Sequence, residues 1–397
     1  MVAAAADHGR GNVIRLAIAQ ALAGANSTVI YATGAILGNT LAPDKALATL
    51  PISILVVGIA ASTLPTGMIA RRYGRRAAFM AGTGCGVIVG LLSAAAVFLG
   101  SFWLFCAATF FGGVYQAVVL SFRFAVADGV RPELRPRAMS AVMAGGVFAG
   151  VLGPQLVTFT MNLWQPYLFA ATFLAQAGVA LVSAFILWGV RLPRPATAAE
   201  VAVGRPLGVI ARQPRFIAAV ACGAVSYMLM TLLMTSAPLA MRLCGLSQET
   251  ANLGLQWHVI AMYGPSFFTG RLIARFGAPR VVTTGLLLIA GAAVAGLAGT
   301  EIAYFWLSLI LLGIGWNFGF LGASALVLEC HRPEERTRVQ SLNDFLVFGM
   351  MVVAIFASGG LLAEYGWAMV CWISFPPLLI AWLALRAQAS RRIATVA

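Results

Sequence analysis

Charged side chains are scarce in this 397-residue chain: Asp, Glu, Lys and Arg make up 10% of it, and Lys45 is the one lysine. A soluble protein usually carries about 25% charged residues. Apolar residues reach 61%, and runs of about 20 of them, each long enough to cross a hydrocarbon core, recur along the chain. The composition therefore excludes a soluble enzyme and predicts an all-α polytopic membrane protein.

Cysteine and histidine are also rare, with six and three residues respectively. The cysteines show no paired spacing, so we expect free thiols and no disulfide framework. Within the apolar runs we find neither a carboxylate cluster nor a nucleophile next to a base. We therefore expect no enzymatic activity and no bound cofactor.

The net charge of +14 comes almost entirely from arginine. The arginines gather after every second apolar run, at 71–76, 131–137, 191–215, 271–280, 332–338 and 386–392. This alternation follows the positive-inside rule and predicts that both termini lie in the cytoplasm. Contact with anionic membrane lipid explains the charge better than a nucleic-acid partner, which we do not expect.

Apolar runs between polar breaks predict twelve transmembrane helices in two six-helix halves. The predicted spans are 13–40, 46–70, 77–99, 102–127, 137–162, 166–189, 215–241, 248–271, 280–299, 302–328, 339–362 and 366–386. An Arg/Pro-rich stretch, 190–214, is predicted to be a cytoplasmic linker between an N-terminal half, 1–189, and a C-terminal half, 215–397.

The two halves repeat each other in sequence. Gly67, Arg72 and Gly74 recur 203 residues later as Gly270, Arg275 and Gly277. A second repeat places the segment 131–137 over 332–338, with Arg-Pro-Glu at the start of each. Both repeats fall in corresponding loops, which supports a duplicated fold.

With this repeat, the chain resembles the major facilitator superfamily over essentially its whole length. The resemblance rests on the loop that holds Gly67, Arg71, Arg72, Gly74, Arg75 and Arg76. It implies alternating access, with this loop bracing one conformational state. Arg71 stands where the family pattern has Asp, so we hypothesise that Asp344, or Glu334 and Glu335, supplies the counter-charge. The alternative is that all of these are solvated loop charges. Asp128 and Asp344 could titrate, but interfacial ion pairing is the better expectation.

Two pairs of soft metal ligands lie in the seventh and eighth predicted spans. Met230 and Met234 are four residues apart, as are His258 and Met262, and this spacing places each pair on one helix face. If the outer connection turns near residue 244, Met230 and His258 lie at equal depth near the bilayer midplane. Thioether and imidazole favour Cu(I). Met241, Cys222 and Cys244 are possible relay residues. Packing is the alternative for any single methionine, and a hydrogen bond to a neighbouring helix is the alternative for His258.

These paired motifs resemble those of the CcoA-like copper importers, a branch of the same superfamily. The resemblance implies that Met230, Met234, His258 and Met262 bind copper. It also implies import across the bacterial cytoplasmic (inner) membrane for assembly of a cbb-type cytochrome oxidase. We further expect a monomer that passes copper to a cytoplasmic chaperone. One alternative is a transporter of small organic solutes or drugs, favoured by aromatic residues such as Trp257, Tyr263, Trp316 and Phe318. Another is a non-transporting copper sensor or assembly factor.

Overall fold

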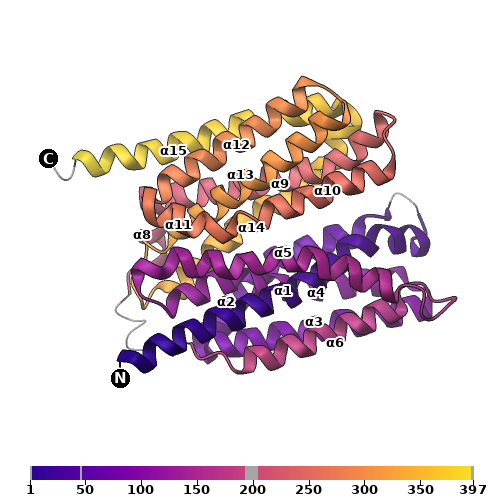
Figure 1. The fold of residues 1–397 in the computed structure, drawn as a ribbon, viewed down its shortest axis with the longest axis horizontal. Helices are drawn as coiled ribbons and strands as arrows, with labels where there is room; N and C mark the ends of the chain where they lie inside the picture. Colours follow the sequence, from indigo (N-terminus) through magenta and orange to yellow (C-terminus); the bar gives the residue numbers. More distant parts are fainter. Residues whose placement is uncertain (1, 45–46, 193–203, 395–397) are drawn as a thin grey trace. The chain divides into compact units, whose positions relative to one another are not determined.

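A computed structural model describes residues 2–44, 47–192 and 204–394, and these residues form helices and connecting turns without a β-strand. The chain divides into two compact units, Met1–Pro195 and Ala196–Ala397, whose helices are labelled in Figure 1. The division falls inside the predicted linker, 190–214. Residues 193–203 of that linker, together with Lys45, lie outside the described residues.

The first unit is a bundle of six long helices. They are α1 (Val2–Leu41), α2 (Leu50–Tyr73), α3 (Arg75–Leu99), α4 (Phe102–Asp128), α5 (Arg135–Thr160) and α6 (Ala170–Trp188), with the short 3-10 turn η2 (Pro132–Leu134) before α5. The principal packing pairs are α1 with α5, α2 with α4, and α3 with both α4 and α6. All six helices contain a segment long and apolar enough to cross a membrane.

The second unit repeats this plan with one interruption. Its helices are α8 (Leu207–Ala211), α9 (Pro214–Leu243), α10 (Gln248–Tyr263), α11 (Ser266–Phe276), α12 (Ala278–Ala298), α13 (Ile302–Val327), α14 (Arg336–Trp372) and α15 (Phe375–Ala394). Gly366, with φ 75° and ψ 177°, breaks the helical path of α14 near the predicted boundary between the last two spans.

The predicted eighth span, 248–271, is not one continuous helix. It is divided into α10 and α11 at Gly264 and Pro265, because proline has no N–H to continue the helical hydrogen bonds. Among the described residues eleven helices therefore meet the length needed for a membrane span, and the broken pair stands where the twelfth was expected. The all-α, polytopic fold class is confirmed.

Glycines set the tight turns that the sequence repeat predicted. Gly74 joins α2 to α3 with φ 88°, and Gly277 joins α11 to α12 with φ 84°. Left-handed backbone of this kind strongly favours glycine. The two repeated loops thus share backbone geometry as well as sequence.

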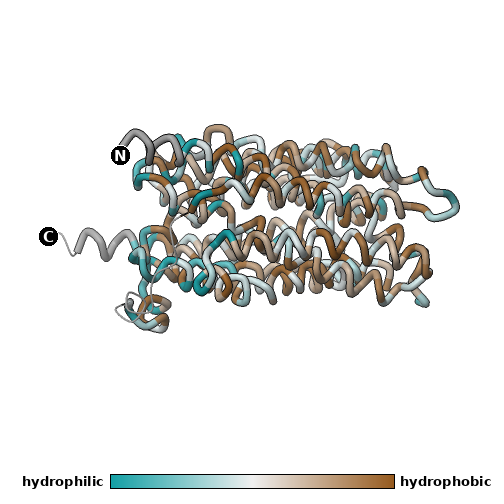
Figure 2. Tube along the Cα trace, turned by 90° about the horizontal axis from the view of Figure 1, so that it is seen from below, coloured by the Kyte–Doolittle hydropathy of each residue, from teal (hydrophilic) through white to brown (hydrophobic). Residues whose placement is uncertain are grey.

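Long apolar faces cover the outside of both bundles. Phe159 and Phe185 in the first unit are 73% and 81% exposed, and Leu287 in the second is 64% exposed. Figure 2 shows hydrophobic residues along the middle of the helices and hydrophilic residues gathered towards helix ends. Apolar surface along eleven helices of membrane-spanning length is typical of contact with lipid, so the chain is a multi-pass membrane protein.

Candidate functional site

Helix α13 is the centre of the second unit and packs against α9, α10 and α12. Two glycines permit its close contacts. A Cβ at Gly313 would lie 2.7 Å from the carbonyl oxygen of His258 on α10, and one at Gly319 would lie 2.2 Å from Oγ of Ser226 on α9. Small residues let membrane helices approach at backbone distance, and here they bring α9 and α10 onto α13.

The close approach at Gly313 positions the ring of His258. Its side chain is fully buried, and Nδ1 lies 2.7 Å from the carbonyl oxygen of Leu309 on α13. A carbonyl oxygen only accepts, so Nδ1 donates the proton and Nε2 of the neutral ring carries a lone pair. Within the described part of the chain, Nε2 has no hydrogen-bond partner.

A buried polar network closes the break between α10 and α11. The Asn317 amide on α13 donates to the Met262 carbonyl oxygen at 2.6 Å and to Ser266 Oγ at 2.7 Å. Thr269 Oγ1 lies 2.7 Å from Asn317 Oδ1 and 2.8 Å from the Pro265 carbonyl oxygen, so its one proton is shared between these acceptors. The Met262 and Pro265 carbonyl oxygens at the break thus find donors inside the unit.

Aromatic rings fill the space beside this network. Tyr227 on α9 packs edge-on against Trp316, Phe320 and Phe348 at centroid distances of 5.5, 5.0 and 5.3 Å. Tyr263, the last residue of α10, packs edge-on against Trp316 at 5.6 Å. Trp316 is fully buried, and its Nε1 has no hydrogen-bond partner among the described residues. We call these five residues the aromatic cluster.

The predicted copper ligands occupy this region, and among the described residues no hydrogen bond joins any two of their side chains. Met230 and Met262 are buried, and Met234 is half-buried. Of the possible relay residues, Met241 and Cys222 are fully buried, and the Cys222 thiol lies 3.6 Å from the Ala381 carbonyl oxygen on α15. Cys244 is exposed at the end of α9.

Contacts with α13 shift the predicted depths by about one helical turn. Ser226 lies against Gly319, and α9 runs opposite to α13, so Met230 comes level with residue 315. Met262 lies beside Gly313 and Asn317, at that same depth. His258, bonded to Leu309, lies one turn away, close to the level of Met234. The pairing of Met230 with His258 is therefore wrong, because α10 is anchored to α13 and not set by the outer turn alone.

The metal role itself stays a prediction. Over the described ranges, no group of three or more His, Cys, Asp or Glu residues is placed to hold a metal ion. His258 makes the hydrogen bond to a neighbouring helix that was the alternative to ligation. All six cysteines are free thiols, as expected.

In the first unit, the predicted conformational loop holds an internal ion pair. Arg75 contacts Asp128 Oδ2 at 2.6 Å through Nη2 and 3.0 Å through Nε. Arg76 lies over the Trp188 ring, 4.5 Å from its centroid, while Arg71 and Arg72 are exposed. Asp128 is therefore an ion-pair partner, as the sequence favoured.

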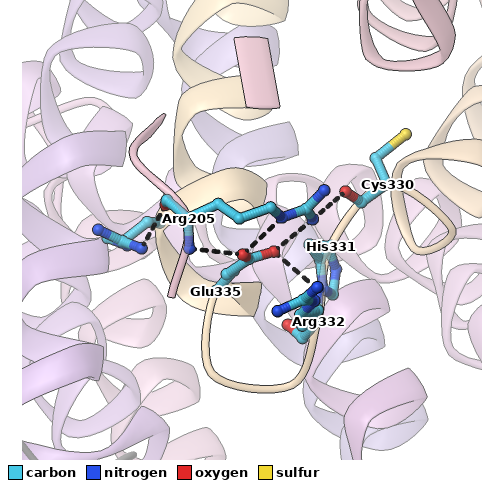
Figure 3. A network of polar contacts seen from close by, with 6 residues as sticks. Arg205, Cys330, His331, Arg332 and Glu335 are labelled. Carbon is cyan, nitrogen blue, oxygen red and sulfur yellow. Dashed lines mark hydrogen bonds and ion pairs between the residues drawn. The ribbon is translucent and has the colours of Figure 1, made fainter. Parts of the chain in front are cut away.

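Two of the acidic residues proposed to balance the charge of Arg71, Asp344 and Glu335, are buried in the second unit. Asp344 is buried, and its Oδ1 accepts from Asn343 Nδ2 at 3.0 Å. Glu335, also fully buried, pairs with Arg205 at 2.6 Å and accepts from the Arg332 backbone N–H at 2.9 Å (Figure 3). The Arg205 guanidinium lowers the pKa of Glu335 to about 2. Glu335 is thus paired with Arg205 inside its own unit, and a counter-charge to Arg71 stays a prediction.

Several buried polar residues escaped the sequence interpretation. Asn317 was one, and Arg123, fully buried on α4, was another. In the first unit, Asn26 Nδ2 also donates to the Gln176 carbonyl oxygen at 3.0 Å, joining α1 to α6. Their common signal is a strongly polar residue inside an apolar run, which marks function by default in a membrane helix.

Comparison with known proteins places these features in a family. The model of the Major Facilitator Superfamily matches residues 16–343 and 219–394. The riboflavin transporter RfnT of Brucella anthropi is 45% identical over 369 residues, covering 92% of this chain and 93% of RfnT. The uncharacterized MFS-type transporter YdeG of Bacillus subtilis is 28% identical, covering 84% and 81% of the two chains.

The fold is also that of solved transporters. The structure of the human organic anion transporter MFSD10 (TETRAN) superposes with a TM-score of 0.77 at 16% identity, covering 95% of this chain and 99% of that one. At this identity the likeness concerns the fold alone. Neither RfnT nor YdeG is named for copper, so the copper-importer branch of the sequence-based prediction gains no support.

Proposed function

The chain belongs to the major facilitator superfamily, and from that membership we propose that it transports a small organic solute across a bacterial inner membrane, with riboflavin as the candidate cargo. This is the alternative that the sequence left open beside copper. It is supported by the 45% identity to RfnT over nearly the full length of both chains.

The aromatic cluster is the observation within this chain that best supports such a cargo. Flat heteroaromatic rings bind by stacking and edge-to-face contact with aromatic side chains. Tyr263 and Trp316 lie next to the break between α10 and α11, and interrupted helices commonly form the solute sites of secondary transporters. In this proposal the two halves alternate access to that site, and the protein carries out no chemical conversion.

Uptake of riboflavin into proteoliposomes tests the proposal. We expect the purified protein to give saturable riboflavin uptake that protein-free vesicles lack. Replacing Tyr263 with Ala should lower the initial rate about tenfold, because loss of one stacking contact costs about 1–3 kcal/mol. Trp103→Ala is the matched control, since Trp103 is 61% exposed in the first unit and should transport as the native protein does.

Measuring Cu(I) accumulation in the same vesicles tests the copper hypothesis alongside the riboflavin one. Riboflavin uptake at background level, combined with Cu(I) accumulation that Met230→Ala and Met262→Ala abolish, would replace the riboflavin proposal with the copper one. In that case the predicted cytoplasmic copper chaperone and the predicted monomeric state would be the next properties to test. Riboflavin uptake without Cu(I) accumulation would leave the methionines as packing residues.

A further inference from the structure

A buried acceptor without a donor stands out in the second unit. His258 is fully buried, its Nδ1 proton is committed to Leu309, and its Nε2 lone pair has no partner in the described residues. Buried polar atoms are nearly always hydrogen-bonded, because an unmade bond carries the full cost of desolvation. An acceptor of this kind inside a membrane helix is completed by a water molecule or by a ligand, and polar groups at such positions commonly serve function.

The surroundings of His258 are rigid. Gly313 fixes the distance between α10 and α13, since a Cβ there would also lie 2.9 Å from the Met262 backbone nitrogen. The hydrogen bond to Leu309 fixes the ring's tautomer and orientation. Nε2 is therefore a preorganised acceptor with a defined direction, which is what a specificity-determining group requires.

A second unpartnered polar atom lies on α13, about one turn beyond Gly313. Trp316 follows Gly313 by three residues, and its buried indole N–H has no acceptor among the described residues. The same ring packs against Tyr263 at 5.6 Å and stacks on Phe320 at 5.2 Å with an interplanar angle of 16°. An unmet acceptor on α10 and an unmet donor on α13 thus lie in the two helices that Gly313 holds in close contact.

We propose that His258 and Trp316 recognise the amide or imide edge of a heteroaromatic cargo, with His258 Nε2 accepting its ring N–H and Trp316 Nε1 donating to the adjacent carbonyl. The inference rests on the proposed function and deepens it, because it names the chemical feature that the site reads. The riboflavin ring system carries such an edge, an N–H between two carbonyl groups. Solutes that lack the N–H leave Nε2 unpaired and are rejected for that reason.

The test compares riboflavin with its N3-methyl derivative, in which the ring N–H is replaced by N–CH₃. Initial uptake rates of both are measured in proteoliposomes with the native protein and with His258→Ala, His258→Gln, Trp316→Phe and His331→Ala. Size-exclusion elution of each variant reports folding. His331 is the control because its ring lies in the loop after α13, where Nε2 already contacts Gln340 at 3.2 Å.

The native protein should prefer riboflavin about tenfold or more, and His331→Ala should keep that ratio. His258→Ala should bring the ratio close to one, His258→Gln should retain part of it through its amide oxygen, and Trp316→Phe should slow riboflavin uptake. The native ratio needs no substitution, so it decides the question even where a variant fails to fold. Equal uptake of both solutes by the native protein, or an unchanged ratio in folded His258→Ala, overturns this inference alone. Absence of riboflavin uptake by the native protein overturns the proposed function and this inference with it.

Discussion

At the scale of single residues, Asn317 is notable because its side chain bonds to residues on both sides of the break between α10 and α11. It is the only described side chain that bonds both the Met262 carbonyl and the Ser266 hydroxyl. Because the break between α10 and α11 frees backbone groups that lipid cannot satisfy, these bonds hold α11 in line behind α10.

Replacing Asn317 with Leu should destabilise the protein by about 1–3 kcal/mol, since the buried Met262 carbonyl loses its side-chain donor and the bond from Asn317 to Ser266 is also lost. Thermal unfolding in detergent would measure the loss. Thr284→Ala is the control, because the Thr284 hydroxyl is exposed and bonds only to Arg280 in its own helix. An Asn317→Leu melting temperature equal to that of the control would contradict the role assigned to Asn317.

Glu335 makes the stability of the second unit dependent on pH, with stability lost in acid. Its pKa is lowered from 4.5 to about 2 by the Arg205 side chain, so the ionised form is favoured in the folded state. A lowered carboxyl pKa gives stability that is present above the ordinary pKa and is lost as pH falls towards the folded value. The relevant window is therefore from about pH 4.5 down to about pH 2.

Glu335→Gln should flatten the decline in melting temperature across that window and lower stability at neutral pH. Glu133→Gln, at an exposed position in the repeated loop of the first unit, should follow the native profile. The two variants would be compared by melting curves from pH 6 to pH 3. Parallel native and Glu335→Gln curves would show that the ion pair contributes nothing.

At the scale of helices, close approach depends on particular glycines. A Cβ at Gly113 on α4 would lie 2.1 Å from the Leu55 carbonyl oxygen and 2.8 Å from the Gly58 Cα, both on α2. These are backbone atoms, which cannot turn aside as a flexible side chain can. The contact between α2 and α4 therefore requires glycine.

Gly113→Ala should destabilise the first unit by about 1–3 kcal/mol, because the two helices must separate to admit the methyl group. Gly84→Ala and Gly178→Ala are matched controls, since a Cβ at either position would meet nothing within 4 Å, and both should raise or preserve the melting temperature. A Gly113→Ala variant as stable as these would mean that α2 and α4 adjust freely.

At the scale of the whole molecule, the architecture could be predicted because apolar runs and an internal sequence repeat recur along the chain. Apolar run length located the helices, and the repeat of Gly74 at Gly277 predicted a turn that both units share. The break at Pro265 was missed because hydropathy ignores backbone hydrogen bonding: α10 and α11 together read as one apolar run.

The site was harder to predict than the fold. Four-residue spacing correctly placed Met230 and Met234 on one helix. It could not show that the ring of His258 would form a hydrogen bond to Leu309 on α13. Residue types that bind copper also pack well in membranes, so composition could not separate the two roles. The aromatic cluster was assembled from helices α9, α10, α13 and α14, and contacts between such distant segments leave no local pattern.

The broken span also constrains the order in which the chain can be assembled during synthesis. Helices α10 and α11 have 16 and 11 residues, so neither alone is long enough to be recognised as a membrane segment. The donor that completes them, Asn317, follows Ser266 by 51 residues. The bonds that Asn317 makes across the break can therefore form only after α13 has been synthesised, so the final stability of this broken span depends on a later part of the chain.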